Sequence, residues 1–399
     1  MSDGYPLRPL GEVMRLDIQR TPMKPATTYR LAGVLNAGQG LVTKGEFDGG
    51  ETEYTTMNVL HVDQVVMRKL TAWEGPITVV SAEFDGFVVS NEFPTFTLGP
   101  ELMPDWMRHV CRSPRLWTEM KNRVSGTVQR RKRLNPEQLL QIQVPIPPRQ
   151  VQARIVEILD AIDNQITALD TEADAIQAVL RRLRADSMTD GAVDEVRADE
   201  AFTITMGRQR SPQRSTGPYM TPYLRSANVG YGTFNFSDVL EMDFTPAERE
   251  SFGLRYGDVL VSEGSASETA VGMPAMWRDE IPAPICFQNT LLRYRAVDGV
   301  TIPAFVNHWC QWAYESGQFR EVAGGTNIKH IGSKRAARMP VRLPSIEHQA
   351  RIAAELDTMS EVVAATRAEA VQLREVRAAL LSGLLDGTIS IDAAELEVA

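Results

Sequence analysis

The 399-residue sequence has few cysteines and no long apolar run. Its three cysteines, Cys111, Cys286 and Cys310, form no Cys-x-x-Cys pair, which argues against a disulfide framework and against a zinc knuckle. No apolar stretch approaches the ~20 residues of a membrane-spanning helix, and the first residues lack a basic-then-apolar signal pattern. We therefore expect a cytoplasmic protein that spans no membrane.

Signatures of common catalytic sites are also missing. The sequence contains no glycine-rich phosphate loop, no Gly-x-Ser-x-Gly elbow and no Asn-Pro-Pro-Tyr-like tetrapeptide of an amino-methyltransferase. Its 43% apolar and 23% charged residues are typical of a soluble globular protein, and the length leaves room for roughly two to three domains. We expect no active site, no metal site and no cofactor in this chain.

The strongest positive pattern is a heptad repeat that occurs twice. Apolar residues recur at alternating intervals of four and three from Ile155 to Leu183, and the series recurs in the same register 197 positions later. Such a seam needs a partner helix, so we expect two long helices that pair as an antiparallel coiled coil. The predicted helix-pairing residues are Ile155, Leu159, Ile162, Ile166, Leu169, Ile176, Leu180, Leu183, Ile352, Leu356, Met359, Val363, Leu373 and Leu380.

The rest of the chain is duplicated as well. Short β-rich runs bounded by glycine-containing turns fill the stretch before each helix, and a helical pattern follows them over 104–124 and again from Pro303. His109 and Cys111 recur 199 positions later as His308 and Cys310. The sequence predicts an α+β fold with a pseudo-two-fold tandem repeat, divided into a globular domain 1–147, a helix 148–191, a globular domain 192–343 and a helix 344–399.

Charge is unevenly distributed along the chain. Residues 148–200 hold 6 Lys and Arg against 12 Asp and Glu, and residues 345–399 hold 4 against 10, whereas the globular stretches are slightly positive. Basic residues cluster at matching places of the two copies, which favours contact with nucleic-acid phosphates. The candidate DNA-binding residues are Arg68, Lys69, Arg130, Arg131, Lys132, Arg133, Arg208, Arg210, Arg214, Lys329, Lys334 and Arg335.

Several of these features resemble one known family, the specificity subunits of Type I restriction-modification systems. The resemblance rests on Pro145-Ile146-Pro147-Pro148 with Gln152-x-x-Ile155, and on Leu343-Pro344 with Gln349-x-x-Ile352, each at the start of a long helix. It also includes the Ser-Gly-Thr and Gly-Gly-Thr tripeptides that precede these segments. The chain departs from the usual motif at Arg149, Val151, Ser345 and His348, which concerns contacts at the helix starts.

This resemblance implies a non-catalytic subunit that reads DNA sequence. The globular domains would be target recognition domains, and the paired helices a spacer that also binds methyltransferase subunits, expected to number two. The double-stranded DNA target would be bipartite and asymmetric. S-adenosylmethionine would bind to the partner methyltransferase, and endonuclease or translocase subunits would join the complex in some systems.

Two other hypotheses remain open on the sequence. Asp105, Glu119 and Lys121 match the spacing of a PD-(D/E)xK-like nuclease, although the second copy has Ala304 and Gln318 in place of the carboxylates. The second hypothesis is a coiled-coil adaptor that binds only proteins. It predicts that the chain has no salt-dependent affinity for DNA.

Overall fold

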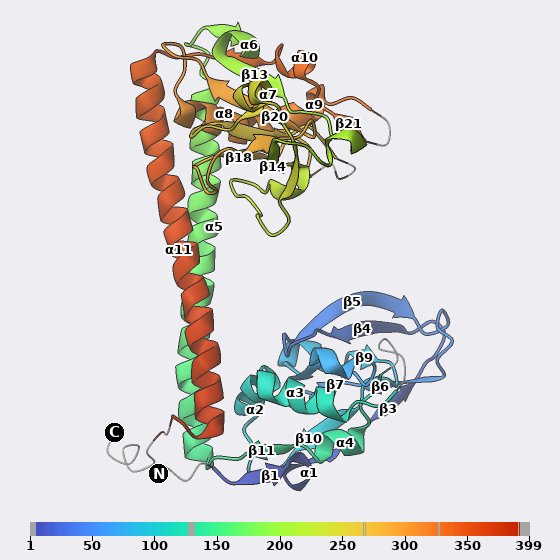
Figure 1. Ribbon diagram of the computed structural model, residues 1–399. Coiled ribbons are helices and arrows are strands. Elements are labelled where there is room, and N and C mark those ends of the chain that lie inside the picture. The colour runs from blue at the N-terminus through green and yellow to red at the C-terminus, as the bar shows by residue number, and fades with distance from the viewer. Residues whose placement is uncertain are drawn as a thin grey trace. The chain divides into compact units, whose positions relative to one another are not determined.

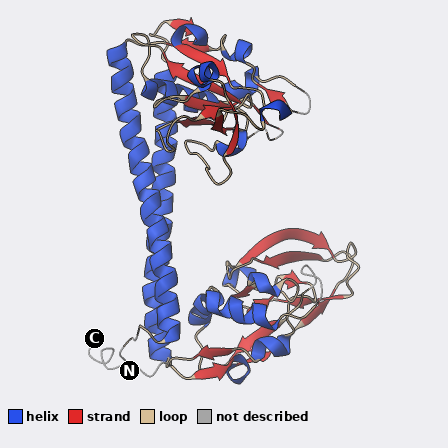
Figure 2. Cartoon of the chain, in the orientation of Figure 1, coloured by secondary structure: helices blue, strands red, loops and turns tan. Residues whose placement is uncertain are grey.

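The computed structural model describes residues 5–126, 132–265, 267, 269–325, 328–389 and 391. The chain forms two compact units: unit 1 comprises Met1–Asp170 and Ala368–Ala399, and unit 2 comprises Thr171–Arg367. Two long helices, α5 (Arg149–Met188, 40 residues) and α11 (Ile346–Asp386, 41 residues), contribute to both units. Each unit therefore contains a globular part of mixed strands and short helices, and a portion of both long helices (Figures 1 and 2).

Two sheets form the globular part of unit 1. One has the strand order β2-β10-β7-β8 and the other the order β3-β6-β9-β4-β5, in which β4 and β5 form the longest antiparallel pairing. A separate pairing of β1 with β11 ties the beginning of the chain to the segment before α5. The strands are β1 (Leu7–Pro9), β2 (Met14–Leu16), β3 (Arg20–Pro22), β4 (Thr28–Val34), β5 (Leu41–Asp48), β6 (Thr56–Val59), β7 (Val65–Met67), β8 (Ile77–Val79), β9 (Val88–Val89), β10 (Thr95–Leu98) and β11 (Gln143–Pro145).

Short helices cover the four-stranded sheet of unit 1. Trp106 and Met107 of α2 and Met120 of α3 are fully buried in one core with Phe96 of β10. Burial of large apolar side chains is the main stabilising contribution here. The helices are α1 (Leu10–Val13), α2 (Pro104–Cys111), α3 (Pro114–Arg123) and α4 (Pro136–Leu140), with 3-10 turns η1 (Ala72–Glu74) and η2 (Ala82–Phe84).

Unit 2 repeats the central part of this plan. Its four-stranded sheet has the order β13-β20-β16-β18, and β12 pairs with β22 as β1 pairs with β11. A three-stranded sheet, β15-β14-β19, and the pair β17-β21 complete it. The strands are β12 (Glu195–Arg197), β13 (Phe202–Met206), β14 (Met220–Leu224), β15 (Leu240–Asp243), β16 (Val259–Ser262), β17 (Gly264–Ser265), β18 (Pro274–Met276), β19 (Cys286–Phe287), β20 (Leu291–Ala296), β21 (Lys329–His330) and β22 (Pro340–Arg342).

The short helices of unit 2 also follow the order seen in unit 1. Trp309 of α8 and Phe319 of α9 are fully buried against Tyr294 of β20, which gives this core a cluster of aromatic rings. None of the described helices is both long enough and apolar enough to cross a membrane. The helices are α6 (Ala198–Ala201), α7 (Pro246–Phe252), α8 (Pro303–Glu315), α9 (Gln318–Val322) and α10 (Ser333–Ala336), with 3-10 turns η4 (Pro212–Arg214) and η5 (Ser226–Asn228).

Within each unit, α5 and α11 lie side by side in antiparallel order (Figure 1). In unit 1 the early α5 residues Asp163 and Asp170 pair with the late α11 residues Arg377 and Arg374. In unit 2 the α5 residues Leu180 and Met188 share a core with the early α11 residues Ile352 and Leu356. Of the fourteen predicted helix-pairing residues only Leu183 is exposed. The thirteen that are buried or partly buried are Ile155, Leu159, Ile162, Ile166, Leu169, Ile176, Leu180, Ile352, Leu356, Met359, Val363, Leu373 and Leu380.

The structure corrects the predicted seam at its end. Leu183 is 44% exposed, whereas Arg184 is 2% exposed and pairs with Glu315 of α8 at 2.7 Å. An α-helix has 3.6 residues per turn rather than 3.5, so a straight heptad pattern drifts around the helix and brings the next residue inward. The helix also ends at Met188, before the predicted stop at Asp190-Gly191.

A second correction concerns the helical pattern over 104–124. The structure contains two helices there, α2 and α3, and Ser113 between them has extended backbone with φ −80° and ψ 126°. Pro114 imposes this break, because the proline ring disfavours helical backbone in the residue before it.

The burial of two neighbouring leucines on α5 can be compared directly. Leu180→Ala should lower the free energy of unfolding by about 2–5 kcal/mol, because Leu180 is 2% exposed, whereas Leu183→Ala should change it by less than about 0.5 kcal/mol. Urea unfolding of the two full-length variants measures the difference. Equal losses would contradict the change of seam at Arg184.

Candidate nucleic-acid interface

A buried glutamine joins each long helix to its globular part. In unit 1 the Gln152 amide nitrogen donates to the carbonyl oxygens of Glu101 (2.9 Å) and Pro147 (2.8 Å), and its oxygen accepts from the Met103 amide (2.9 Å). The Gln152 side chain is 0% exposed. A buried primary amide that bonds three backbone groups at once fixes the helix start against the loop before α2.

Gln349 makes the same joint in unit 2. Its amide nitrogen donates to Val300 (2.9 Å) and Pro344 (2.9 Å), and its oxygen accepts from the Ile302 amide at 3.1 Å. This residue is also 0% exposed. The glutamines noted in the sequence therefore attach each globular part to a long helix in the same way.

A histidine and an aspartate form a second joint in each unit. The ring nitrogen Nε2 of His109 lies 3.0 Å from Asp160 of α5, and Nε2 of His308 lies 2.9 Å from Asp357 of α11. Both histidines project from the short helix that covers the four-stranded sheet, α2 or α8. The repeated histidines thus hold the globular part to the helix.

The His109 joint has an additional cation that the His308 joint lacks. Arg377 of α11 donates to Nδ1 of His109 at 3.0 Å and to Asp163 at 2.9 Å, so Nε2 of His109 carries the hydrogen that Asp160 accepts. Among the described residues His109, Asp160 and Asp163 form the one group of three that could hold a metal ion. The Arg377 guanidinium already binds His109 and Asp163 and supplies the positive charge that a metal ion would otherwise bring to this group.

The cysteines beside these histidines take no part in the joints. Burial raises the pKa of Cys111 to about 12 and raises the pKa of Cys310 as well, so both thiols stay protonated at neutral pH. A protonated thiol is a poor metal ligand, because metals bind the thiolate.

Four of the predicted cations of unit 1 lie in one place. The Thr71 amide donates to the Lys132 carbonyl at 3.0 Å and the Leu134 amide to the Lys69 carbonyl at 3.1 Å, so the segments after β7 and before α4 run together. Arg68 pairs with Glu74 at 2.9 Å, and Arg133 pairs with Glu92 at 3.2 Å. Arg130 and Arg131 lie outside the described residues.

The predicted cations of unit 2 fall into two places. Lys329 lies on β21 and Lys334 and Arg335 on α10, where Arg335 donates to the Ile331 carbonyl at 2.8 Å. Arg208 and Arg214 both pair with Glu248 of α7, and Arg210 between them is exposed. The sequence contains no pattern that singles out Glu248, which lies 34 residues after Arg214 on α7, and the described residues of unit 1 have no helix between β5 and β6 to match α7.

Both tripeptides before the long helices have a glycine that the backbone requires. Gly126 has φ 130° and Gly325 has φ 128°, a region that other residues rarely adopt. A β-carbon on Gly325 would lie 2.2 Å from the Ile328 carbonyl oxygen. The glycine of each tripeptide therefore has the same backbone conformation in both copies.

Comparison with known proteins adds sequence evidence. A family model described as the Type I restriction modification DNA specificity domain matches residues 117–178. The Type I restriction enzyme StySPI specificity subunit of Salmonella potsdam is 25% identical over 175 residues, which are 42% of this chain and 36% of that protein. The match thus spans about a third of the relative's length.

Solved structures share the fold. A structure described under complex assembly and conformational transition of the type I R-M system has a TM-score of 0.68 and 19% identity, and the match covers 96% of this chain and 98% of that one. The HsdS subunit from Thermoanaerobacter tengcongensis matches with a TM-score of 0.50 and 18% identity, and the S subunit from M. genitalium with 0.53 and 13%; each match covers 98% of both chains.

The family model and the curated relative are both those of Type I specificity proteins, and the solved structures share the fold of this chain. They agree with the resemblance seen in the sequence, and they support DNA recognition as the role of the family. The matched segment 117–178 includes Gln152 and Asp160, so the family model spans residues of both joints of unit 1.

The structure offers the nuclease hypothesis no assembled site. Asp105 pairs with Arg108 on α2, and Glu119 pairs with Arg123 on α3, so each carboxylate is neutralised on its own helix. Neither belongs to the one metal-capable group of three found among the described residues.

The glutamine joint can be tested by truncation. Gln152→Ala should lower the free energy of unfolding of unit 1 by about 3 kcal/mol, because it removes three partly or fully buried hydrogen bonds, those to Glu101, Met103 and Pro147. Gln165→Ala removes an exposed glutamine from the same helix and should be nearly neutral. Denaturant titration compares the variants, and a neutral Gln152→Ala would contradict the joint.

The His109 joint predicts loss of stability in acid. Burial first, and then the charge of Arg377, lower the pKa of His109 below 6.5, against the opposing effect of Asp160. The unfolded chain then binds the proton more readily, so stability falls as the pH drops below about 6.5, by at most about 1.4 kcal/mol per pH unit.

Unfolding midpoints of His109→Gln should therefore change less between about pH 7.5 and about pH 5.5 than those of the unmodified chain. Arg112 and Asp163 also face this ring and are kept in both proteins. His61→Gln, which removes a half-buried histidine of the same unit outside the joint, is the matched control. A steeper acid loss in His109→Gln would contradict the assignment.

Proposed function

We propose that this chain is the DNA sequence-recognition subunit of a Type I restriction-modification complex. The two globular parts act as target recognition domains, and the chain itself is not catalytic. The observation that carries the proposal is the duplicated joint, in which Gln152 and Gln349 attach the two domains to long helices through equivalent contacts. A protein that reads one site needs one such domain, whereas two similarly mounted domains suit a target in two parts.

The long helices would set the distance between these two parts. We propose that α5 and α11 pair along their length as an antiparallel coiled coil, supported by the antiparallel ion pairs within each unit. A helix of 40 residues measures about 60 Å at ~1.5 Å per residue, comparable to nearly two turns of duplex DNA. The gap in the target would then follow from helix length.

The two half-sites would differ in sequence, because the domains present different elements. Unit 1 carries the hairpin of β4 and β5, whereas unit 2 carries α7 and the sheet β15-β14-β19. Side chains from these elements would read base edges in the major groove, while the predicted cations contact phosphates. Those cations are Arg68, Lys69, Lys132, Arg133, Arg208, Arg210, Arg214, Lys329, Lys334 and Arg335 among the described residues.

The outer faces of the helices would bind two methyltransferase subunits. Val179 of α5 and Val376 of α11 occupy equivalent positions of the repeat, 197 residues apart, and are 52% and 55% exposed. Equivalent exposed apolar residues in both copies suit two identical partners. The methyltransferase would supply S-adenosylmethionine, and the complex would act in the cytoplasm, with endonuclease subunits where the system restricts DNA.

Selection from random duplex DNA tests the proposal. The complex of this chain with its methyltransferase should enrich a two-part motif with a constant gap. Deletion of one heptad from both α5 and α11 should keep both half-sites and shorten the gap, since each residue contributes ~1.5 Å of helix.

A matched control deletes the same number of residues after Gly387, beyond the end of α11, and should leave the gap unchanged. A gap that does not respond to the heptad deletion would refute the spacer. No enrichment, with no salt-dependent affinity for DNA, would instead favour an adaptor that binds only proteins.

A further inference from the structure

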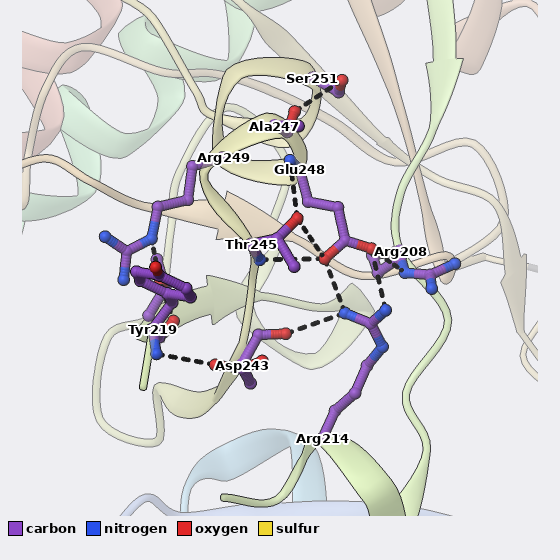
Figure 3. A network of polar contacts seen from close by, with 10 residues as sticks. Arg208, Arg214, Tyr219, Asp243, Thr245, Ala247, Glu248, Arg249 and Ser251 are labelled. Atoms are coloured by element: carbon purple, nitrogen blue, oxygen red, sulfur yellow. Dashed lines mark hydrogen bonds and ion pairs between the residues drawn. The ribbon is translucent and has the colours of Figure 1, made fainter. Parts of the chain in front are cut away.

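A loop of unit 2 places two arginines, Arg208 and Arg214, around a single carboxylate, that of Glu248 (Figure 3). We call residues 208–219 the arginine loop. Arg214 donates to both Glu248 oxygens, at 2.8 and 2.9 Å, and Nε of Arg208 lies 2.9 Å from the same carboxylate. Glu248 therefore binds both ends of a segment whose middle carries the exposed Arg210.

The position of Glu248 is itself fixed by a helix start. Glu248 is the third residue of α7, and Thr245 caps this helix by accepting from the Glu248 amide at 3.3 Å. The Glu248 carboxylate in turn accepts from the Thr245 amide at 3.0 Å, which completes a capping box. The side chain that holds the arginines therefore has little rotational freedom.

The other end of the arginine loop is held as firmly. Asp243, the last residue of β15, accepts from the Tyr219 amide at 2.7 Å through its carboxylate and from Arg214 at 3.0 Å through its carbonyl. Arg249 of α7 lies over the Tyr219 ring at 5.5 Å and donates to Thr221 at 2.9 Å. Two adjacent residues of α7, Glu248 and Arg249, thus fix the loop from both sides.

The cluster keeps an excess of positive charge. Arg214 and Arg208 together lower the pKa of Glu248 to about 2, with hydrogen bonding to Arg214 as the largest cause, so the carboxylate is ionised at neutral pH. Two guanidinium groups share this one negative charge. Figure 3 shows the terminal nitrogens of Arg208 pointing away from Glu248, and the Arg208 and Arg214 side chains are 37% and 21% exposed.

We propose that Glu248 is a positioning residue that holds Arg208 and Arg214 as a preformed clamp for a DNA phosphate. This inference rests on the proposed function and assigns the phosphate contact of the second recognition domain to the arginine loop. A guanidinium binds phosphate in a fixed, forked geometry, and a side chain that is already oriented loses less conformational entropy on binding.

In this proposal the negative charge of Glu248 strengthens DNA binding. An acidic residue near DNA ordinarily repels phosphates, so its removal should strengthen binding. A positioning role for Glu248 predicts the opposite, because release of Arg208 and Arg214 disorders the clamp. The sign of the change in affinity therefore separates the two roles.

The experiment compares Glu248→Gln with Glu250→Gln in the full chain bound to its methyltransferase. Both substitutions remove one negative charge from α7, and Glu250 is exposed. The probe is a duplex with the selected target, titrated at several salt concentrations. Glu248→Gln should bind about tenfold more weakly with a salt slope lower by roughly one to two, whereas Glu250→Gln should bind equally or more tightly.

A second variant separates geometry from folding. Arg208→Lys with Arg214→Lys keeps both charges but removes the forked guanidinium groups, and it should also bind about tenfold more weakly. Thermal unfolding of each variant checks that the domain remains folded. If Glu248 only stabilised the fold, the dependence of DNA affinity on salt concentration would not change. Tighter binding by Glu248→Gln, or unchanged binding by the double lysine variant, would overturn the clamp.

The outcome also separates the clamp from the broader proposal. If the unmodified complex shows no salt-dependent affinity for duplex DNA, the recognition function itself fails. If that complex binds its target and Glu248→Gln binds as tightly, only the role of Glu248 fails.

Discussion

The structure depends on one kind of contact, a buried primary amide that satisfies three backbone groups where a long helix begins. Gln152 and Gln349 each bind the loop before a short helix and the proline-containing segment before their own helix. Without the amide, backbone groups that are partly or fully buried would lose their hydrogen bonds, which is unfavourable where water has little access. Each of these side chains, together with the histidine joint, therefore sets the orientation of a globular part on its helix.

The two copies differ in the charged residues that surround the histidine–aspartate joint. His109 lies between Asp160 and Arg377, whereas His308 contacts Asp357 and its other ring nitrogen is buried without a hydrogen-bond partner among the described residues. The position equivalent to Arg377 in the repeat is Leu180. Duplication has thus preserved the contact that joins helix to domain while the neighbouring electrostatics diverged.

The features that could be predicted from the sequence are those that occur in both copies of the repeat. The heptads of α5 and α11, the tandem copies and the glutamine motif all appear twice in the chain, and the paired Asp160 and Asp357 could have been found by the same comparison. Arg184 was missed because a heptad pattern does not account for the drift of a real helix. The contacts of Arg208 and Arg214 with Glu248 were not predictable, because residues distant in sequence meet there in a segment that has no second copy.

The joints and the surfaces of the two units are built from different residues. The hairpin of β4 and β5 in unit 1, and α7 with the arginine loop in unit 2, supply no hydrogen bond to the joints of Gln152 or Gln349. Under the proposed function, each half-site and the gap between them can therefore change separately during evolution. A small number of surface variants and helix lengths would then combine into a much larger number of distinct targets.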